Sequence, residues 1–322
     1  MAETPLHEIR TLRGVPAPVE RALNAALSRG PGYEPTPIGP AFQEREVSGY
    51  YIDFRAKTTS PTAGDLDALP ATPLIQLALG WWERHCAGEA GALDRFLGLC
   101  SSIEDRADDA GDELHWPIRT TVTKYRLVAP WLSALPQAQA ASVFVRARLA
   151  TGEERYAELA QAAVGPFTRP GSPLVADTPE GPVLEEAPCF PAAHILNGWM
   201  SASWGLWDVH LGLGDAACGA LFRATIDCLR SRLATYDTGW WSLYSVYPHA
   251  VRDLAKPIYH RFHVAQLQVL HRLTREEWLG AAAERWAAYD RPSNRVRALT
   301  QKGAFTVADG MRRRRWSAAA AG

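Results

Sequence analysis

Residues Gln137-Ala-Gln-Ala-Ala-Ser-Val-Phe-Val-Arg-Ala-Arg-Leu149 have the pattern of one helix, and Arg155 to Val164 have the pattern of a second. In the first stretch, Val145 and Leu149 keep the spacing of apolar side chains on one helical face. Thr151-Gly152 lies between the two stretches, and glycine is typical of turns. The sequence therefore predicts two helices joined by a tight turn, which is a helical hairpin.

The same pattern occurs four times along the chain. The turns fall at residues 88, 152, 214 and 274, at intervals of 64, 62 and 60 residues. A near-constant period of helix pairs indicates a stacked or closed helical array. The predicted fold class is therefore all-α, an α/α toroid (an incomplete barrel) of repeated helical hairpins. The other three predicted pairs are Leu74 to Cys86 with Leu93 to Cys100, Ala192 to Val209 with Ala216 to Leu233, and Val264 to Leu273 with Glu276 to Tyr289.

The composition along the chain predicts three segments. Residues 1–70 are rich in Pro, Gly and Thr, which prevents long helices, so we expect an irregular segment that wraps the main domain. Within it, Gly49 to Lys57 alternates enough to predict a short strand. Residues 71–292 hold the helix pairs and form the predicted catalytic domain. Residues 293–322 form a C-terminal extension whose basic end, from Arg312, is expected to be disordered.

The overall composition limits the class of protein. A chain of 322 residues with 47% hydrophobic content can bury a large core, and a net charge of −1 attracts neither nucleic acid nor a membrane surface. We find no signal-peptide pattern, no apolar run of about 18 residues and no Cys-x-x-Cys among the five cysteines. We therefore expect a cytoplasmic protein with a small-molecule or saccharide substrate and with no nucleic-acid or membrane partner. A homodimer is left open.

Residues able to transfer protons are concentrated near the fourth hairpin. Tyr236-Asp-Thr-Gly-Trp-Trp-Ser-Leu-Tyr244 is followed by Tyr259-His-Arg-Phe-His263. Tyrosine and histidine can both give and take protons at accessible pKa values. Proton transfer is therefore the first chemistry to consider.

Several segments together resemble one family, the C-terminal domain of the D-glucuronyl C5-epimerases. Its patterns Tyr-Asp-Thr-Gly-x-x-x-x-Tyr and Tyr-His-x-x-His-x-x-Gln-Leu match the two tyrosine motifs above. The resemblance covers about residues 110 to 290, and it implies an isomerase that inverts the carbon next to a uronate carboxylate without a cofactor. Further matching segments are Trp116-Pro-Ile118, the run from Trp131 through Gln137 to Ala140, Val145 to Gly152, Glu185-Glu-Ala-Pro188 and His194-Ile-Leu-Asn-Gly-Trp-Met200.

The resemblance places functional positions of the family at Glu186, Tyr244 and Tyr259, which are the predicted catalytic residues. Epimerisation next to a carboxylate needs two proton carriers and a cation that holds the carboxylate as it takes enolate character. Two positions depart from the family pattern, since Ala187 replaces a tyrosine and Tyr247 replaces an arginine. These departures favour a small carboxylated or glycosylated substrate over a polysaccharide, in an isomerase or lyase reaction.

Other residues of the matched segments are predicted to bind the substrate. Arg119 directly follows Trp116-Pro-Ile118 and is a candidate cation for the carboxylate, as are Arg261 and Lys256. The predicted substrate-binding residues are Trp116, Arg119, Gln137, Asn197, Tyr236, Asp237, Tyr247, His260, Arg261 and His263.

Three motifs have a structural explanation beside the functional one. His260 and His263 are spaced for a metal pair, but a third ligand is missing, so we predict no metal and no cofactor. Asp237 lies in one Asp-Thr-Gly motif, whereas an aspartic protease needs two, so we expect it to cap a turn. Asn197-Gly198 lies within a helical pattern, where glycine costs about 1 kcal/mol relative to alanine. Close packing or a polar contact would explain this glycine.

Two other functions remain open. Asp108, Asp109 and Asp112 have the spacing of the metal-binding aspartates of terpene synthases, so an aromatic-lined helical barrel could be a terpenoid or polyene cyclase. That function requires a continuous helix and carboxylates that point into a cavity, and Gly111 interrupts the run. The other alternative is a non-catalytic carbohydrate-binding protein, which predicts that the three catalytic candidates do not converge on one pocket.

Overall fold

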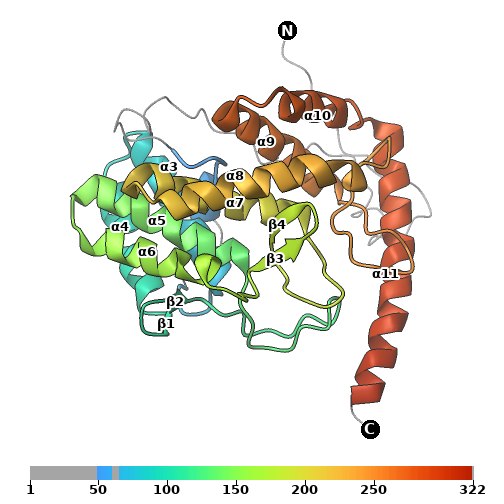
Figure 1. The fold of residues 1–322 in the computed structure, drawn as a ribbon, viewed down its shortest axis with the longest axis horizontal. Coiled ribbons are helices and arrows are strands. Elements are labelled where there is room, and N and C mark those ends of the chain that lie inside the picture. Colours follow the sequence, from blue (N-terminus) through green and yellow to red (C-terminus); the bar gives the residue numbers. More distant parts are fainter. Residues whose placement is uncertain (1–48, 60–64, 321–322) are drawn as a thin grey trace. The chain divides into compact units, whose positions relative to one another are not determined.

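The computed structural model describes residues 49–59 and 65–320, with side chains up to Arg312. It divides into two compact units, one with the described residues up to Ala234 and one with Thr235 to Ala320. We call them the first unit and the second unit. The regular structure in both is mostly helical (Figure 1), which confirms the predicted all-α class.

Three helical hairpins make up most of the first unit. They are α3 (Ala71–Cys86) with α4 (Ala92–Glu104), α5 (Ala134–Thr151) with α6 (Arg155–Thr168), and α7 (Leu196–Leu213) with α8 (Ala216–Arg232). The two members of each hairpin pack against each other, and α5 also packs against α3 and α7 (Figure 1). The three hairpins predicted for this part of the chain are therefore confirmed.

Glycine makes the turns of these hairpins possible. Gly152 and Gly214 have φ angles of 74° and 75°, and Gly88 and Gly91 also have positive φ. This left-handed region is strained for residues with a side chain. The backbone N–H of Gly152 donates to the carbonyl of Arg148 at 2.8 Å, which ends α5.

The helices α5 and α7 form the interior of the first unit. Residues 136–147 of α5 and 196–206 of α7 are all buried. A helix that is buried on every side has no polar face to place in water. The two backbones approach closely where Gly205 meets Ala138, since a β-carbon at residue 205 would lie 2.2 Å from the Ala138 carbonyl oxygen.

A buried ion pair joins these two helices. Arg146 on α5 contacts Asp208 on α7, with 2.6 Å between Nη1 and Oδ2, and neither side chain is exposed. The Tyr51 hydroxyl donates to Asp208 Oδ1 at 2.5 Å, and the Arg146 guanidinium lies 5.0 Å from the ring centroid of Tyr50. Leaving one partner of such a pair alone in the interior would be costly. The cluster therefore fixes the segment around residues 50–51 against α5 and α7.

The predicted strand over Gly49 to Lys57 is wrong. Tyr50, Tyr51 and Ile52 are all buried, so burial does not alternate as it would in a half-buried strand. Only Ile52 makes a single bridge, and the chain then enters the 3-10 helix η1 (Arg55–Thr59). Most of the predicted wrapping segment lies outside the described residues.

Two short strand pairs follow α4 and α6. β1 (Asp108–Asp109) pairs antiparallel with β2 (Leu114–His115), and β3 (Val175–Thr178) pairs antiparallel with β4 (Gly181–Leu184). Glu185 and Glu186 come directly after β4. The second strand pair therefore positions the segment predicted to carry the catalytic glutamate.

The second unit contains the fourth predicted hairpin. The 3-10 helix η3 (Leu233–Tyr236) lies at the boundary, α9 (Pro257–Thr274) packs against α10 (Glu277–Ala287), and α11 is Pro292–Ala320. α9 begins at Pro257 rather than at Val264, because proline is well tolerated in the first helical position. The turn residue after α9 is Arg275, with φ of 61° in place of a glycine.

The C-terminal end differs from its prediction. A disordered tail was expected from Arg312, but α11 continues to Ala320. Arginine and alanine are both strong helix formers, which explains why a basic, alanine-rich end is helical here. No helix among the residues described is long and apolar enough to cross a membrane. Closure of the hairpins into a toroid and the segment boundaries at 70 and 292 stay predictions.

Candidate active site

Glu186 lies between β4 and α7, and its carboxylate meets the first turn of α7. The backbone N–H of Gly198 donates to this carboxylate, and Nδ2 of Asn197 donates to Oε2 at 3.4 Å. Because α7 begins at Leu196, the Gly198 N–H is one of the donors that have no acceptor inside the helix. Glu186 therefore caps α7, and the structure brings two predicted site residues, Glu186 and Asn197, together.

Gly198 makes this contact possible. A β-carbon at residue 198 would lie 2.0 Å from Oε2 of Glu186 and 2.4 Å from its Cβ. Both distances are far inside van der Waals contact, so the carboxylate fits here only beside a glycine. Close packing and a polar contact together explain the glycine within this helix.

The surroundings of Glu186 raise the pKa of its carboxyl to about 7. Burial is the main cause, because loss of water disfavours the charged form. The neighbouring Glu185 carboxylate also raises the pKa, whereas the Lys124 ammonium and the Gly198 N–H lower it. A carboxyl with a pKa near 7 exchanges protons readily at neutral pH.

Glu185 is the second carboxylate of this segment. It is buried, and its Oε1 lies 2.5 Å from Nδ1 of His194. His194 has a φ of 41°, which is rare for a residue other than glycine. The chain from β4 to α7 is thus held by two neighbouring glutamates, one facing His194 and one facing the start of α7.

Trp116 and Gln137 belong to the internal frame of the first unit. Gln137 is fully buried, and its Nε2 donates to the carbonyls of Ala163 (2.9 Å) and Leu114. Its Oε1 accepts from the Trp116 N–H at 3.4 Å, and the Trp116 indole donates to the Ile103 carbonyl at 2.8 Å. These polar atoms bind other parts of the protein, so a role in substrate binding stays a prediction for both residues.

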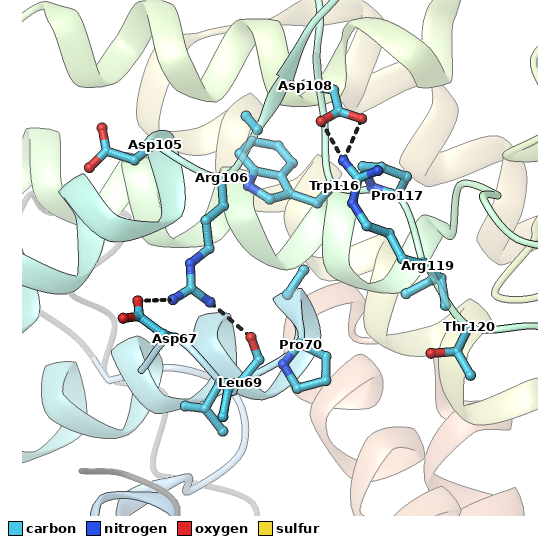
Figure 2. Close-up of a pocket in the computed structure, with 14 residues that line it drawn as sticks. Asp67, Leu69, Pro70, Asp105, Arg106, Asp108, Trp116, Pro117, Arg119 and Thr120 are labelled. Atoms are coloured by element: carbon cyan, nitrogen blue, oxygen red, sulfur yellow. Dashed lines mark hydrogen bonds and ion pairs between the residues drawn. The ribbon is translucent and has the colours of Figure 1, made fainter. Parts of the chain in front are cut away.

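Arg119 lines a pocket of about 610 Å³ in the first unit, together with Trp116 (Figure 2). Its Nη2 donates to both carboxylate oxygens of Asp108, at 2.7 and 2.9 Å. Arg119 is exposed, as a cation that meets a dissolved anion must be. We call this cavity the Arg119 pocket.

The aspartates of the cyclase alternative do not have the arrangement it requires. Asp108 and Asp109 form β1 rather than a helix, and Asp108, Asp109 and Asp112 are all exposed. Asp109 accepts from the Gly111 N–H at 2.8 Å, which fixes a turn. Within residues 49–59 and 65–320, no group of three or more His, Cys, Asp or Glu could hold a metal ion. The continuous helix with inward carboxylates is therefore not observed.

In the second unit, Tyr244 and Tyr259 contact each other edge to face. Their ring centroids are 5.1 Å apart at an interplanar angle of 73°, and both side chains are half-buried. The Tyr244 N–H donates to the Asp253 carbonyl at 2.7 Å, and Asp253 forms an ion pair with Lys302 on α11. The Lys302 ammonium lies 5.5 Å from the Tyr244 ring centroid, so a cation accompanies the tyrosine pair.

Asp237 holds the loop after η3 to α10. Its Oδ1 accepts from the Gly239 N–H at 2.8 Å, and its Oδ2 accepts from Trp286 Nε1 (2.9 Å) and Arg285 Nε (3.0 Å). The Tyr289 hydroxyl donates to Oδ1 at 3.1 Å. Burial acts to raise the pKa of Asp237, but these donors outweigh it and the net pKa is lowered. The structure thus gives Asp237 the loop-holding contacts expected for a turn cap.

His260 and His263 share one partner, Ser242, in the interior of the second unit. Ser242 Oγ lies 2.8 Å from His260 Nδ1 and 2.9 Å from His263 Nδ1, and all three residues are fully buried. His260 Nε2 lies 3.0 Å from the Trp286 carbonyl, so Nε2 carries the proton and Nδ1 accepts. Burial lowers the pKa of His260 to about 4 and that of His263 well below its usual value. Both histidines are therefore neutral at pH 7.

Three other predicted residues of the second unit, Tyr236, Tyr247 and Arg261, make the following contacts. Tyr236 is fully buried, and its carbonyl accepts from the Leu243 N–H at 2.8 Å. Tyr247 is 6% exposed, and its hydroxyl accepts from Arg312 Nη1 at 3.4 Å. Arg261 lies 4.0 Å from Asp290. Tyr247 replaces an arginine of the family pattern, and the guanidinium of Arg312 on α11 lies beside it here.

No local sequence pattern predicts a site role for Lys124, Ser242, Asp253 or Lys302. Lys124 and Asp253 lie in irregular loops without a residue pattern, so nothing local marks them. Lys302 lies beyond the segment of resemblance. Ser242 lies inside the Tyr236–Tyr244 motif, and its spacing to His260 is not a known signal.

Together, these features define an all-α protein of helical hairpins, with a glutamate of raised pKa at the start of α7 and a tyrosine pair in edge-to-face contact. The chain belongs to the family described as D-glucuronyl C5-epimerase C-terminus, whose family model matches residues 110–288. The match includes Glu186, Tyr244 and Tyr259, and it confirms the resemblance seen in the sequence.

Two relatives show the extent of the similarity. A D-glucuronyl C5-epimerase of Caenorhabditis elegans is 28% identical over 199 residues, which are 54% of this chain and 31% of that protein. An uncharacterized protein of Methanocaldococcus jannaschii is 27% identical over 161 residues, which are 48% of this chain and 50% of that protein. The chain therefore spans only between about a third and a half of the length of these relatives.

Proposed function

We propose that the protein is a glucuronyl C5-epimerase-like isomerase that moves a proton at the carbon next to a carboxylate, with Glu186 as one proton carrier and no cofactor. The observation that carries the proposal is the carboxyl of Glu186, held at the start of α7 with its pKa raised to about 7. A base with a pKa near the working pH balances the amount of ionised form against its basicity. Family membership supports this reaction class.

Tyr244 and Tyr259 are the proposed second source of protons. They match functional positions of the family, and their edge-to-face contact sets the direction of each ring. The Lys302 ammonium is placed to stabilise negative charge that develops on Tyr244. These contacts within the second unit are the grounds for proposing proton transfer by the tyrosine pair.

The proposed substrate is a small carboxylated or glycosylated molecule. Ala187 and Tyr247 stand where the family has a tyrosine and an arginine, so contacts made by those side chains in a longer saccharide are changed. Lys124, whose charge acts on Glu186, and Arg119, which lines a pocket, are the proposed cations for the substrate carboxylate. An enolate-like intermediate needs such a cation.

Solvent deuterium uptake tests this function. The protein would be incubated in D₂O with D-glucuronate, with uronate oligosaccharides and with an extract of the source cells, and the products analysed by mass spectrometry. We expect label next to a carboxylate, and loss of labelling by about 100-fold or more in Glu186→Gln and in Tyr244→Phe or Tyr259→Phe. The matched controls are Glu158→Gln, which changes an exposed glutamate on α6, and Tyr156→Phe on the same helix.

Two outcomes would contradict the proposal. Full labelling by all three site variants would remove the assigned roles. Saccharide binding without any labelling would instead favour the non-catalytic carbohydrate-binding alternative.

A further inference from the structure

The hydrogen bonds around Ser242 determine where the protons of two buried histidines lie. Burial lowers the pKa of both His260 and His263, so each ring carries a single proton at pH 7. His260 Nε2 donates to the Trp286 carbonyl at 3.0 Å, so His260 Nδ1 is an acceptor. The Ser242 hydroxyl lies 2.8 Å from this Nδ1 and therefore donates to it. Because a hydroxyl has only one proton, the 2.9 Å contact between Ser242 Oγ and His263 Nδ1 requires His263 to be the donor.

The two histidines therefore hold their protons on opposite ring nitrogens, His260 on Nε2 and His263 on Nδ1. Nε2 of His263 is then a lone pair, and it is buried with no hydrogen-bond partner among the residues that the structure describes. The other tautomer of His263 would leave an N–H unpaired there and would also remove the donor to Ser242. The bonds run in one direction, from His263 through Ser242 and His260 to the Trp286 carbonyl, and bonds in such a chain strengthen one another.

This chain of bonds joins the two segments that carry the tyrosine pair. Ser242 lies two residues before Tyr244, and its carbonyl accepts from the Ala255 N–H at 3.0 Å. His260 directly follows Tyr259 in the first turn of α9. Neighbouring side chains on a helix point about 100° apart, so a rotation of this turn would move both of them. The bond between Ser242 and His260 therefore fixes the direction of Tyr259 relative to the segment of Tyr244.

Trp241 also restrains the ring of His260. The indole stacks on the imidazole, with 3.9 Å between ring centroids and an interplanar angle of 15°. Trp241 Nε1 donates to the Ala255 carbonyl at 2.8 Å, and both stacked rings are fully buried. Turning the imidazole would leave buried polar groups without partners, which is costly. The start of α9 is thus held in one orientation.

We propose that Ser242 is a positioning residue, which sets Tyr259 against Tyr244 through two histidines in opposite tautomers. Its side chain is fully buried, so it acts through His260 rather than on a dissolved molecule. The effect of Ser242 on turnover rests on the proposed function, whereas the tautomers and the placing of the tyrosines do not.

Nitrogen-15 NMR of the whole protein, labelled at histidine, tests the tautomers without a substrate. At pH 7 we expect a proton on Nε2 of His260 and on Nδ1 of His263, which the chemical shifts of the ring nitrogens distinguish. His260→Asn and His263→Asn assign the signals by removing them one at a time. The same tautomer in both histidines would overturn the proposal.

Ser242→Ala tests the positioning. We expect shifted aromatic NMR signals of Tyr244 and Tyr259, because ring currents in an edge-to-face pair depend on its geometry. In deuterium uptake, kcat should fall at least about tenfold while KM stays within about twofold, because a misplaced group slows the chemical step. Ser242→Thr keeps the hydroxyl and should restore most of the rate. Ser203→Ala on α7, which removes a buried hydroxyl that donates to the Met200 carbonyl at 2.7 Å, should change neither readout.

Unchanged tyrosine signals or an unchanged kcat in Ser242→Ala would overturn the positioning role. If Ser242→Thr does not fold, His263→Asn, which keeps a donor near Nδ1, is compared with His263→Leu, which has none. Equal kcat of these two variants would also contradict the proposal. Absence of deuterium uptake in wild type would instead remove the proposed function, and the NMR signals would still decide whether Ser242 places the tyrosines.

Discussion

The carboxylate of Glu186 occupies the space that a side chain at residue 198 would fill, since a β-carbon on Gly198 would lie 2.0 Å from Oε2. The position of Glu186 therefore depends on the glycine at residue 198 in α7. It places a carboxyl against the positive end of α7, where the Gly198 N–H can bind it. The proposed chemistry depends on this arrangement.

Gly198→Ala is expected to displace Glu186 and reduce activity by about 100-fold, the scale of a lost general base. The melting temperature should change little, because the higher helix propensity of alanine stabilises α7 while displacement of the Glu186 segment destabilises the protein. Deuterium uptake and thermal unfolding check this. Gly303→Ala on α11, where a β-carbon would meet nothing within 4 Å, is the matched control. A fully active Gly198→Ala variant would contradict the account.

Glu83→Gln is expected to flatten the pH dependence of stability. Burial raises the pKa of Glu83 from 4.5 to about 7, although the Tyr50 N–H and Arg146 oppose it. Because the folded-state pKa is the higher one, the stability that Glu83 contributes is complete below pH 4.5 and is lost as pH rises through 7. The loss is on the order of 3 kcal/mol at most. Denaturant unfolding at several pH values should show a smaller loss in Glu83→Gln than in wild type and in Glu158→Gln, with the part due to the raised pKa of Glu186 still present.

Asp237→Asn is expected to destabilise the protein by about 2 kcal/mol, because an amide cannot accept from all the donors around Asp237. The folded-state pKa of Asp237 is lowered, so its contribution is present at neutral pH and is lost as pH falls below 3.8. Urea unfolding at pH 7 measures the effect, with the exposed Asp227→Asn as control. Equal stability of the two variants would show that the loop does not depend on Asp237.

Arg275→Gly is expected to stabilise the protein by about 1 kcal/mol. Arg275 ends α9 with a φ of 61°, a conformation that costs a residue with a side chain about 1–2 kcal/mol and glycine nothing. Gln268→Gly, at an exposed position inside the same helix, should destabilise by about 1 kcal/mol. Thermal unfolding of both variants measures this difference, because the melting temperature should rise in Arg275→Gly and fall in Gln268→Gly. Destabilisation by Arg275→Gly would contradict the assigned turn.

The helical hairpins could be predicted because their signals are local. Apolar spacing and the turns at Gly88, Gly152 and Gly214 lie within a few residues of the elements they define. Apolar spacing predicts the start of α9 too late, at Val264, because the first helical residue is Pro257 and a proline start is not part of the apolar pattern. The predicted strand near residue 50 is wrong because contacts with α5 and α7 bury consecutive side chains there. In a segment this short, such contacts outweigh the alternation of polar and apolar residues.

The site could be predicted only in part. The resemblance indicated Glu186, Tyr244 and Tyr259, but their environment depends on residues distant in sequence. Contacts of Lys302 with Asp253 and of Gly198 with Glu186 arise when the chain folds, and no local pattern encodes them. Residues chosen by motif also include fully buried ones such as Gln137, because a motif does not distinguish packing from binding.

The most direct test of the central claim is the rate of solvent deuterium uptake into a uronate as a function of pH, in wild type and in Glu186→Gln. With Glu186 as the base, the wild-type rate should rise as pH increases, with an apparent pKa near 7, because burial raises the pKa of the Glu186 carboxyl to about 7. Glu186→Gln should lose the rate and the transition together. A wild-type rate that does not change between about pH 6 and 8, or a Glu186→Gln variant with the same profile, would contradict the account.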